Sequence, residues 1–530
     1  MRWNKEIFRF AGSREFSCFC LVFFALWLGF PNNFLEAPLL ILFWPLGCAF
    51  LGKFGANTKK ALIAGWLATF FGAIPCLYWL YMPVHEVGDL HFAPAFACAL
   101  LIAFAVASQS GLFSVGAYFA KNAHPALAAV FLGLLWWVLE YLYALIGGFP
   151  WLTPAASLAE WPFTLQIADI MGAYAADGLW ICAVLLCALS LPKIYGKFLA
   201  GTFFCGLCVC ALICGYGCVR LNLPEKSAEG IVNALFVEGN IDQNRKWEPA
   251  FQRETLEHYI ALTENGLELA KKRDISQPLV IWPETALPFF YQLKPEFSQI
   301  LRDFVKQENI PLLFGAPGVE YAPGKAEGAV YNRAFLLGPD GRLLGHYDKE
   351  HLVPFGEYAP AWLKLGFLEA LLQGVGVYEP GQESAPLRYG RLALGMLICY
   401  EGIFPWLARD RVESGANILI DISNDGWFGR SAAARQHLLL TVPRCIEQNR
   451  WLLRATNTGI SAVVDARGRV DMRGDVFQAG SILARADLEE KRSLYYYLAS
   501  GLPFGAFAFL AICAWIIFKN RTGNRPQCCI

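Results

Sequence analysis

Long apolar stretches dominate the first 220 residues. Five lie near 61–81, 92–120, 125–147, 163–191 and 198–219, and two shorter ones lie near 16–30 and 35–51. Because a bilayer core needs about 20 apolar residues per helix, the pattern predicts seven membrane-spanning helices. An eighth stretch, near 495–518, follows a long polar section. A removable signal peptide is the alternative for the first stretch, although no small-residue cleavage site follows it.

The polar section, residues 221–494, alternates strand-like and helix-like patterns. Short apolar or β-branched runs end at polar residues near 231–239, 277–284, 310–320, 391–401 and 416–425. Amphipathic stretches lie near 249–272, 296–309, 404–414 and 431–449, and PDG and ARG turns predict hairpins over 334–349 and 461–470. We therefore expect an α/β layered domain in 221–494, between a bundle of about seven helices in 1–220 and a last span with a tail in 495–530.

Composition agrees with a membrane protein that carries a polar domain. Charged residues make up 17% of the 530-residue chain, whereas soluble domains carry about 25%. Only 20 of the 88 charged residues fall in 1–220, so the apolar part does not fill the chain. Basic and acidic residues balance at 44 each, which leaves no overall basic field to attract nucleic acid. A disordered chain, a collagen and a coiled coil are therefore excluded, and nucleic-acid binding is not expected.

The basic residues of the short loops predict an orientation. They occur in every second loop: Arg2, Lys5, Arg9 and Arg14, then Lys53, Lys59 and Lys60, then Lys121, then Lys193 and Lys197. Such residues are retained on the cytoplasmic side. We therefore expect a multi-pass protein of the bacterial inner membrane, with both termini cytoplasmic and residues 221–494 on the periplasmic side.

Cysteine usage narrows the search for chemistry. Of 17 cysteines, the polar section contains only Cys399 and Cys445. A domain in an oxidising compartment usually pairs its cysteines or omits them. The two residues are thus either one disulfide or include a thiol kept for its reactivity, and both alternatives stay open at this point.

Three predicted strands of the polar section end at reactive side chains: Glu284, Lys349 and Cys399. Acyl transfer through a thioester needs a thiolate nucleophile, a carboxylate that accepts its proton and a cation that stabilises the oxyanion. Each residue could also be purely structural, as a solvated cap, an ion-pair partner or an inert buried thiol. Spacing alone does not show that the three meet.

The motifs around these residues resemble a known superfamily. The segments WPETALP (282–288), YDKEHLVPFGEY (347–358) and LICYEGIFP (397–405) resemble the Glu, Lys and Cys motifs of nitrilase-type carbon–nitrogen hydrolases. These motifs occur here in a longer form, on a domain that lies between seven predicted spans and one further span. In this form and setting they resemble the apolipoprotein N-acyltransferase family. Supporting motifs at 237–249, 422–429 and 454–468 extend the resemblance over nearly the whole chain. It implies an αββα sandwich mounted on a transmembrane helix bundle.

The resemblance also implies roles for individual residues. Glu284 matches the general base, Lys349 the oxyanion-stabilising lysine and Cys399 the nucleophile, while Glu357 matches a second glutamate near the active site. Three more positions match residues tied to substrate handling or to the shape of the site: Trp247, Tyr400 and Glu401. The sequence has no dinucleotide-binding fingerprint and no phosphate-binding glycine loop, so we expect no cofactor and no metal.

The implied reaction has two halves. Cys399 takes an sn-1 acyl chain from a membrane phospholipid, expected to be phosphatidylethanolamine, and a lysophospholipid leaves. The amino group of an S-diacylglyceryl cysteine at the start of an apolipoprotein then attacks the thioester, so the kinetics are ping-pong. A monomer is the default expectation. The rival functions are a membrane-tethered amidase or nitrilase that hydrolyses a small amide or nitrile, and a transporter or scaffold that only binds.

Other residues keep two interpretations at this stage. Four aromatic residues are candidates to exclude water from the thioester: Trp427, Phe428, Phe355 and Phe404. Core packing accounts slightly better for Trp427 and Phe404. Asn424 and Asp425 either shape the site or form a plain turn.

Three acidic residues in or near the spans also have two interpretations: Glu140, Asp169 and Asp177. They either contact headgroups or the lipoprotein amine, or they are structural. Four histidines show no metal-ligand spacing: His258, His346, His351 and His437.

Overall fold

The computed structural model describes residues 14–88, 90–223, 230–321, 328–354, 356–358, 378–382 and 385–523. The chain divides into two compact units. The helical unit comprises Met1–Trp79, Phe96–Leu223 and Ser493–Ile530, and the sandwich unit comprises Leu80–Ala95 and Pro224–Arg492. Three basic residues used for the orientation, Arg2, Lys5 and Arg9, lie outside the described residues.

The helical unit is built from apolar helices. The main ones are α2 (Arg14–Gly29), α3 (Phe43–Phe54), α4 (Thr58–Leu77), α5 (Phe92–Ala120), α6 (Pro125–Leu142), α9 (Ala173–Leu189), α11 (Ala200–Asn222) and α18 (Leu502–Gly523). Within the described residues, five segments are long and apolar enough to cross a membrane: Thr58–Glu86, Phe92–Ala120, Pro125–Gly147, Ala200–Asn222 and Leu502–Arg521. The span predicted over 163–191 is shorter than expected. Its regular helix starts at Ala173, because Gly172 at φ +81° separates it from the short helix α8 (Ala168–Met171).

Small residues let helices of this unit approach closely. A Cβ atom on Gly133 of α6 would lie 2.5 Å from the carbonyl oxygen of Gly178 on α9, and one on Gly178 would lie 2.6 Å from that of Gly133. Such contacts suit a bundle whose helices gain little from the hydrophobic effect when they associate. The last helix, α18, packs against α6, far earlier in the chain.

The acidic residues of this unit mostly have structural partners. Asp169 accepts hydrogen bonds from Tyr216 (2.8 Å) and pairs with Arg220 (2.9 Å). Asp177 accepts the N–H of Ala155 (2.9 Å) in the first turn of α7 (Pro154–Leu158). Glu140 is buried, and among the described residues its carboxylate oxygens have no hydrogen-bond partner. The structural interpretation therefore holds for Asp169 and Asp177.

Two six-stranded sheets form the centre of the sandwich unit. The first has the order β12–β1–β2–β3–β4–β5 and the second β11–β10–β9–β8–β7–β6. The first sheet contains β1 (Gly230–Glu238), β2 (Leu279–Ile281), β3 (Leu312–Glu320), β4 (Ala329–Leu337), β5 (Leu343–Asp348) and β12 (Gly480–Leu488). The second contains β6 (Leu387–Tyr389), β7 (Leu392–Ile398), β8 (Ile418–Ser423), β9 (Leu452–Thr456), β10 (Ala462–Val464) and β11 (Val470–Arg473).

Strand direction explains where functional groups gather. Strands β1, β2 and β3 run parallel in the first sheet, and β7, β8 and β9 run parallel in the second. The inner faces of the sheets meet in one apolar core, which includes Phe236, Leu313, Met396 and Ile420. Parallel strands place their carboxyl ends at one edge of a sheet, so groups that follow them can converge there.

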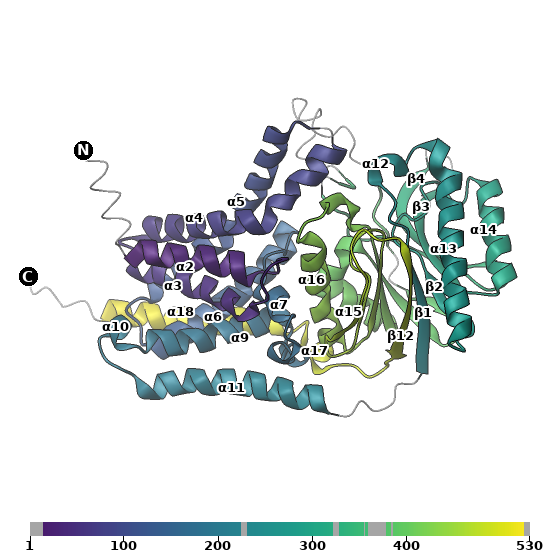
Figure 1. Ribbon diagram of the computed structural model, residues 1–530. Coiled ribbons are helices and arrows are strands. Elements are labelled where there is room, and N and C mark those ends of the chain that lie inside the picture. Colours follow the sequence, from purple (N-terminus) through teal and green to yellow (C-terminus); the bar gives the residue numbers. More distant parts are fainter. Residues whose placement is uncertain are drawn as a thin grey trace, which may run out of the picture. The chain divides into compact units, whose positions relative to one another are not determined.

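Helices cover the outer faces of the two sheets. Figure 1 shows α13 (Gln252–Lys272) and α14 (Pro295–Glu308) along the first sheet, where Leu256, Tyr259 and Leu301 enter a second apolar core. Helices α15 (Pro405–Glu413) and α16 (Ala433–Gln448) pack on the second sheet. The αββα sandwich and both predicted hairpins are confirmed, whereas β6, β9 and β12 were not predicted.

A segment from the first 220 residues belongs to the sandwich unit. Residues Leu80–Ala95 include a short π-helix, Pro83–Val87. A Cβ atom on Gly429 would lie 3.0 Å from the sulfur of Met82, so this segment packs beside the loop that follows β8. The predicted boundary at residue 220 assigns this segment to the helical part of the chain, because an apolar sequence pattern does not reveal which unit a connecting segment contacts.

Candidate active site

Glu284 follows β2 on a backbone that is tightly confined. Its neighbour Thr285 has φ +47°, in the left-handed region. A Cβ atom on Gly315 of β3 would lie 2.5 Å from the nitrogen of Thr285 and 2.7 Å from Cα of Glu284. Only glycine at position 315 leaves room for this turn. The side chain of Glu284 is buried at the end of the strand.

Lys349 directly follows β5 and is 1% exposed. Its Nζ lies 3.4 Å from Oε1 of Glu284 and 3.0 Å from Oε1 of Glu357. Nδ2 of Asn332, on β4, donates to the same two oxygens, at 2.7 Å each. One ammonium and one amide therefore hold both carboxylates. Burial lowers the pKa of Lys349, but the carboxylates of Glu357 and Glu284 outweigh burial and raise it well above its ordinary value.

Cys399 directly follows β7 and also has a left-handed backbone, at φ +57°. Its N–H donates to Oδ1 of Asp421 (3.1 Å), and its carbonyl oxygen lies 3.3 Å from Nε2 of His437. A non-glycine residue keeps such a conformation only when its surroundings hold it, and this strain is typical of functional sites.

The charges of Glu284 and Lys349 both act on the thiol of Cys399. Burial raises the pKa of Cys399 well above its ordinary value, the Glu284 carboxylate raises it further, and the Lys349 ammonium lowers it. The resting group is thus a thiol, which must lose its proton as it attacks. The fold brings together the three residues that the sequence placed 65 and 50 positions apart.

A buried network lies behind Cys399. Arg454 of β9 donates to the carboxylates of Asp421 and Asp425, and Nδ1 of His437 lies 2.9 Å from Oδ1 of Asp425. Burial raises the pKa of Asp425, but Arg454 and His437 outweigh burial and hold it well below its ordinary value. Position 425 is therefore part of a charge network and not a plain turn.

In the part of the chain that the structure describes, two groups of side chains could hold a metal ion by geometry alone. One atom each of Cys399, Asp425 and His437 lies within 4.8 Å of the others. The guanidinium of Arg454 already donates to Asp425 and lies 3.0 Å from His437, so a cation is supplied by the protein itself. The second group, Glu320, His346 and Asp348, is likewise paired with Arg333. Both groups fit ion-pair networks better than metal sites.

The sequence matches proteins of one family along most of its length. Residues 243–496 match the family model for carbon–nitrogen hydrolases, and residues 23–189 match that for the N-terminal domain of apolipoprotein N-acyltransferases. An apolipoprotein N-acyltransferase of Geobacter metallireducens is 32% identical over 506 residues, which cover 93% of this chain and 94% of that protein. This chain belongs to the apolipoprotein N-acyltransferase family. The resemblance of its motifs is thereby confirmed.

Other members of the family match at similar identity. The apolipoprotein N-acyltransferase of Nitrosomonas europaea is 29% identical over 445 residues, covering 82% of this chain and 84% of that protein. Among solved structures, a carbon–nitrogen hydrolase from Helicobacter pylori G27 is 18% identical, with a TM-score of 0.36, covering 48% of this chain and 89% of that one.

Glu401 organises the site of this apolipoprotein N-acyltransferase family member. Its Oε1 accepts the N–H groups of Glu350 (2.7 Å) and His351 (3.0 Å), and its Oε2 accepts the N–H of Ile398 (2.8 Å). The hydroxyl of Tyr347 donates to the same carboxylate at 2.9 Å. One carboxylate thus ties the segment after Lys349 to the strand end before Cys399.

The two other predicted positions differ in exposure. Tyr400 is buried and packs against Phe404 (5.1 Å between ring centroids) and His351 (5.9 Å). Trp247 is 43% exposed, as a residue that handles substrate can be.

The aromatic residues proposed to exclude water have different surroundings. Phe404 is fully buried against Tyr400 and Trp406, which is ordinary core packing. Trp427 and Phe428 are half-buried, and Phe428 lies 6.3 Å from His437 between ring centroids. Phe355 lies outside the described residues.

Neither cysteine of the sandwich unit is in a disulfide. Cys399 and Cys445 are both free and buried, so the disulfide alternative is wrong. The free thiol of Cys399 is available as a nucleophile, and Cys445 lies within α16 as a packing residue.

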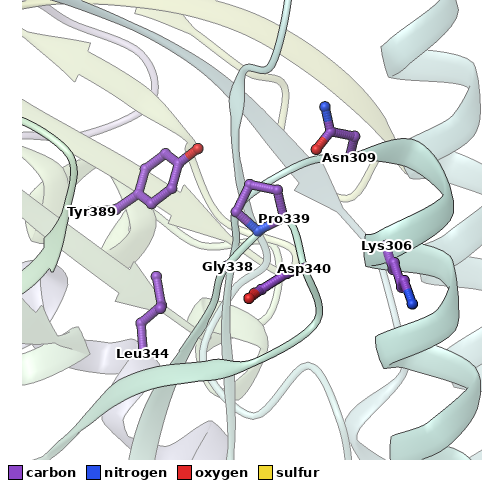
Figure 2. Close-up of a pocket in the computed structure, with 7 residues that line it drawn as sticks. All are labelled: Lys306, Asn309, Gly338, Pro339, Asp340, Leu344 and Tyr389. Carbon is purple, nitrogen blue, oxygen red and sulfur yellow. The ribbon is translucent and has the colours of Figure 1, made fainter.

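A cavity of about 560 Å³ lies away from these groups. Figure 2 shows its lining residues: Lys306, Asn309, Gly338, Pro339, Asp340, Leu344 and Tyr389. They come from the end of α14, the turn between β4 and β5, the start of β5, and β6. None of the predicted site residues lines it.

Asn332, His437 and Arg454 belong to the site but were not assigned to it from the sequence. Asn332 lies mid-strand on β4 and Arg454 mid-strand on β9, where no polar strand end draws attention. A charge or an amide in an otherwise apolar strand is the one signal that could have found Asn332 and Arg454, whereas His437 lies on α16 and gave no such signal.

Proposed function

We propose that this chain transfers an acyl chain from a membrane phospholipid to the amino group of an S-diacylglyceryl cysteine at the start of an apolipoprotein. The observation that carries the proposal is a buried, free Cys399 thiol on a left-handed strand end, under the charges of Glu284 and Lys349. Membership of the apolipoprotein N-acyltransferase family and five apolar helices of membrane-spanning length support it.

The first half-reaction moves the acyl chain onto sulfur. Glu284 takes the proton of the Cys399 thiol as sulfur attacks the sn-1 ester carbonyl, and the Lys349 ammonium stabilises the resulting oxyanion. The tetrahedral intermediate then breaks its bond to the glycerol oxygen, which takes the proton from Glu284. A thioester and a lysophospholipid result.

The second half-reaction returns the enzyme to its first state. The lipoprotein amine attacks the thioester carbonyl and gives a proton to Glu284, while Lys349 again stabilises the oxyanion. The carbon–sulfur bond breaks, the amide forms, and Glu284 returns its proton to the Cys399 sulfur. One acidic side chain therefore serves as base and acid in turn, which suits a carboxylate held by Asn332 and Lys349.

Glu357 has a supporting role in this proposal. Its Oε2 accepts the N–H of Val353 (2.8 Å), while its Oε1 meets Lys349 and Asn332. These contacts fix the ammonium between two carboxylates. Glu357 thus positions the oxyanion-stabilising group without taking the proton itself.

The identity of the donor and the orientation belong to the same proposal. Phosphatidylethanolamine is the proposed acyl donor, and the enzyme is proposed to act as a monomer. The alternation of basic loops supports cytoplasmic termini and a sandwich unit on the periplasmic side of the inner membrane.

Intact-mass measurement tests the proposed chemistry. Purified protein is incubated with phosphatidylethanolamine and no acceptor, beside the Cys399→Ala variant and the matched control Cys445→Ala. One acyl unit is expected on wild type and Cys445→Ala only, removed by hydroxylamine or by a diacylglyceryl-cysteine peptide. A folded wild type that gains no acyl unit but releases ammonia from a small amide would instead establish the amidase function.

A further inference from the structure

A second buried lysine lies beside the proposed base and has no role in the mechanism so far. Lys246 ends the short helix α12 (Gln243–Lys246) and is 1% exposed. Its Nζ donates to Oγ1 of Thr285 at 2.7 Å, and Thr285 directly follows Glu284. Within the described residues, this is the hydrogen bond that the ammonium makes.

Burial of this ammonium is unfavourable for the fold. Burial lowers the pKa of Lys246 to about 7, although the Glu284 carboxylate raises it. A charge removed from water with one neutral acceptor destabilises a fold compared with an apolar side chain of similar volume. Buried charges of this kind cluster where chemistry needs them.

The position of Lys246 completes the confinement of the Glu284 segment. Gly315 of β3 approaches this backbone closely, and the main-chain N–H of Gly315 donates to the carbonyl oxygen of Pro283 (3.2 Å). Lys246 holds the same segment through the Thr285 side chain. The left-handed backbone of Thr285 is thus supported by a strand contact and by a charged hydrogen bond.

Charge balance gives Lys246 a second effect. Glu284 and Glu357 carry two negative charges, and Lys349 supplies one positive charge. The other buried acidic groups of the site have their own cations, since Glu401 faces Arg411 and the two aspartates behind Cys399 face Arg454. In the described part of the site, Lys246 is the remaining cation that acts on Glu284.

We propose that Lys246 is a positioning residue for the base. Its ammonium holds the Glu284–Thr285 segment through Thr285 and places a second positive charge beside Glu284, the group that accepts the Cys399 proton. The role of Glu284 as base rests on the proposed function.

The test compares Lys246→Met, Thr285→Val and their double variant with wild type and with Lys306→Met, a control that removes an exposed lysine from α14. Two rates are measured across pH: acyl-enzyme formation from phosphatidylethanolamine, and alkylation of Cys399 by iodoacetamide, located by peptide mapping. Alkylation needs deprotonation of Cys399 but no lipid, so it reports on the base independently of the substrate.

Both single variants are expected to slow both rates by about tenfold or more. The double variant should be no slower than the slower single variant, because Lys246 acts through Thr285. The difference between wild type and Lys246→Met should shrink as the pH rises above about 7, because the ammonium of wild-type Lys246 then loses its proton. Thermal stability should not fall in Lys246→Met, because a buried charge is removed.

Three outcomes overturn the proposal. Alkylation within about twofold of wild type in Lys246→Met, effects that add in the double variant, or a loss of rate that parallels a loss of thermal stability would each do so. Failure of the proposed function looks different, because wild type then gains no acyl unit while the variants still differ from wild type in alkylation. Lys306→Met should match wild type throughout.

Discussion

Replacement of Glu401 by glutamine turns one carboxylate oxygen into an NH₂ group. The groups that surround this carboxylate are hydrogen-bond donors, so the new NH₂ group has no acceptor there. The carboxylate accepts the main-chain N–H groups of Glu350, His351 and Ile398 and the hydroxyl of Tyr347. The glutamine side chain loses the fewest hydrogen bonds when its oxygen faces the N–H groups of Glu350 and His351. Its NH₂ group then faces the N–H of Ile398, so two donors oppose each other one residue before Cys399.

The expected loss follows from these contacts. A hydrogen bond to a charged acceptor contributes about 1.5–3 kcal/mol, and a buried donor without a partner adds a penalty of similar size. Arg411 also loses one of its two carboxylate neighbours and keeps the other, Glu350, at 2.9 Å. We expect Glu401→Gln to destabilise the sandwich unit by about 3 kcal/mol and to lower its apparent melting temperature by roughly 5–12 °C.

The matched control is Glu350→Gln, which takes a carboxylate from the same Arg411 without disturbing the main-chain bonds to Glu401. Its side chain is 19% exposed, and we expect a loss of about 1 kcal/mol. Thermal unfolding and the rate of acyl-enzyme formation are measured for both variants. Acylation should fall about tenfold in Glu401→Gln, because the segments that carry Lys349 and Cys399 are no longer tied together. Equal stability and equal acylation in the two variants would refute this reasoning.

Three further predictions rest on single residues. Asn332→Asp places a third carboxylate against Glu284 and Glu357, so acyl-enzyme formation should fall more than about a hundredfold, against about tenfold in Asn332→Ala; equal rates in the two variants would contradict it. Burial raises the pKa of Glu238 from 4.5 to about 7, so the folded state binds its proton more tightly than the unfolded chain and stability falls as pH rises through this interval. Glu238→Gln should remove that slope and be more stable than wild type at pH 8 by roughly 1–3 kcal/mol in denaturant titrations, and an unchanged slope would speak against it. Cys445→Ala should keep full acyl-enzyme yield and lose about 1–2 kcal/mol of stability, whereas a lost adduct would give Cys445 a chemical role.

The site residues that the sequence revealed lie at or just beyond the ends of strands. Glu284, Lys349 and Cys399 each directly follow or lie just beyond an apolar run, so pattern and chemistry coincide in one place. The motifs around them added the family and the roles that we expect for these residues. The five described helices of membrane-spanning length were equally visible, because an uninterrupted run of about 20 apolar residues is rare outside membrane spans. The stretches at 16–30, 35–51 and 163–191 form shorter helices.

Residues that act through distant partners gave no such signal. Lys246 lies on a short helix, and its partner Thr285 is 39 positions away. Arg454 bonds to Asp421, 33 positions earlier, and the sequence contains nothing that pairs the two. Strand β12 was missed because its burial is mixed along its length and its partner β1 lies about 250 residues earlier.

The packing of α18 on α6 has a consequence for biosynthesis. Helix α6 leaves the ribosome roughly 360 residues before α18 begins, which corresponds to about 20–70 s at bacterial elongation rates. During that interval α6 has no final partner on this face, and the sandwich unit is made meanwhile. The contact between α6 and α18 can therefore form only after the whole sandwich unit has been translated. A ribosome that stalls earlier leaves this face of α6 without the helix that covers it in the complete chain.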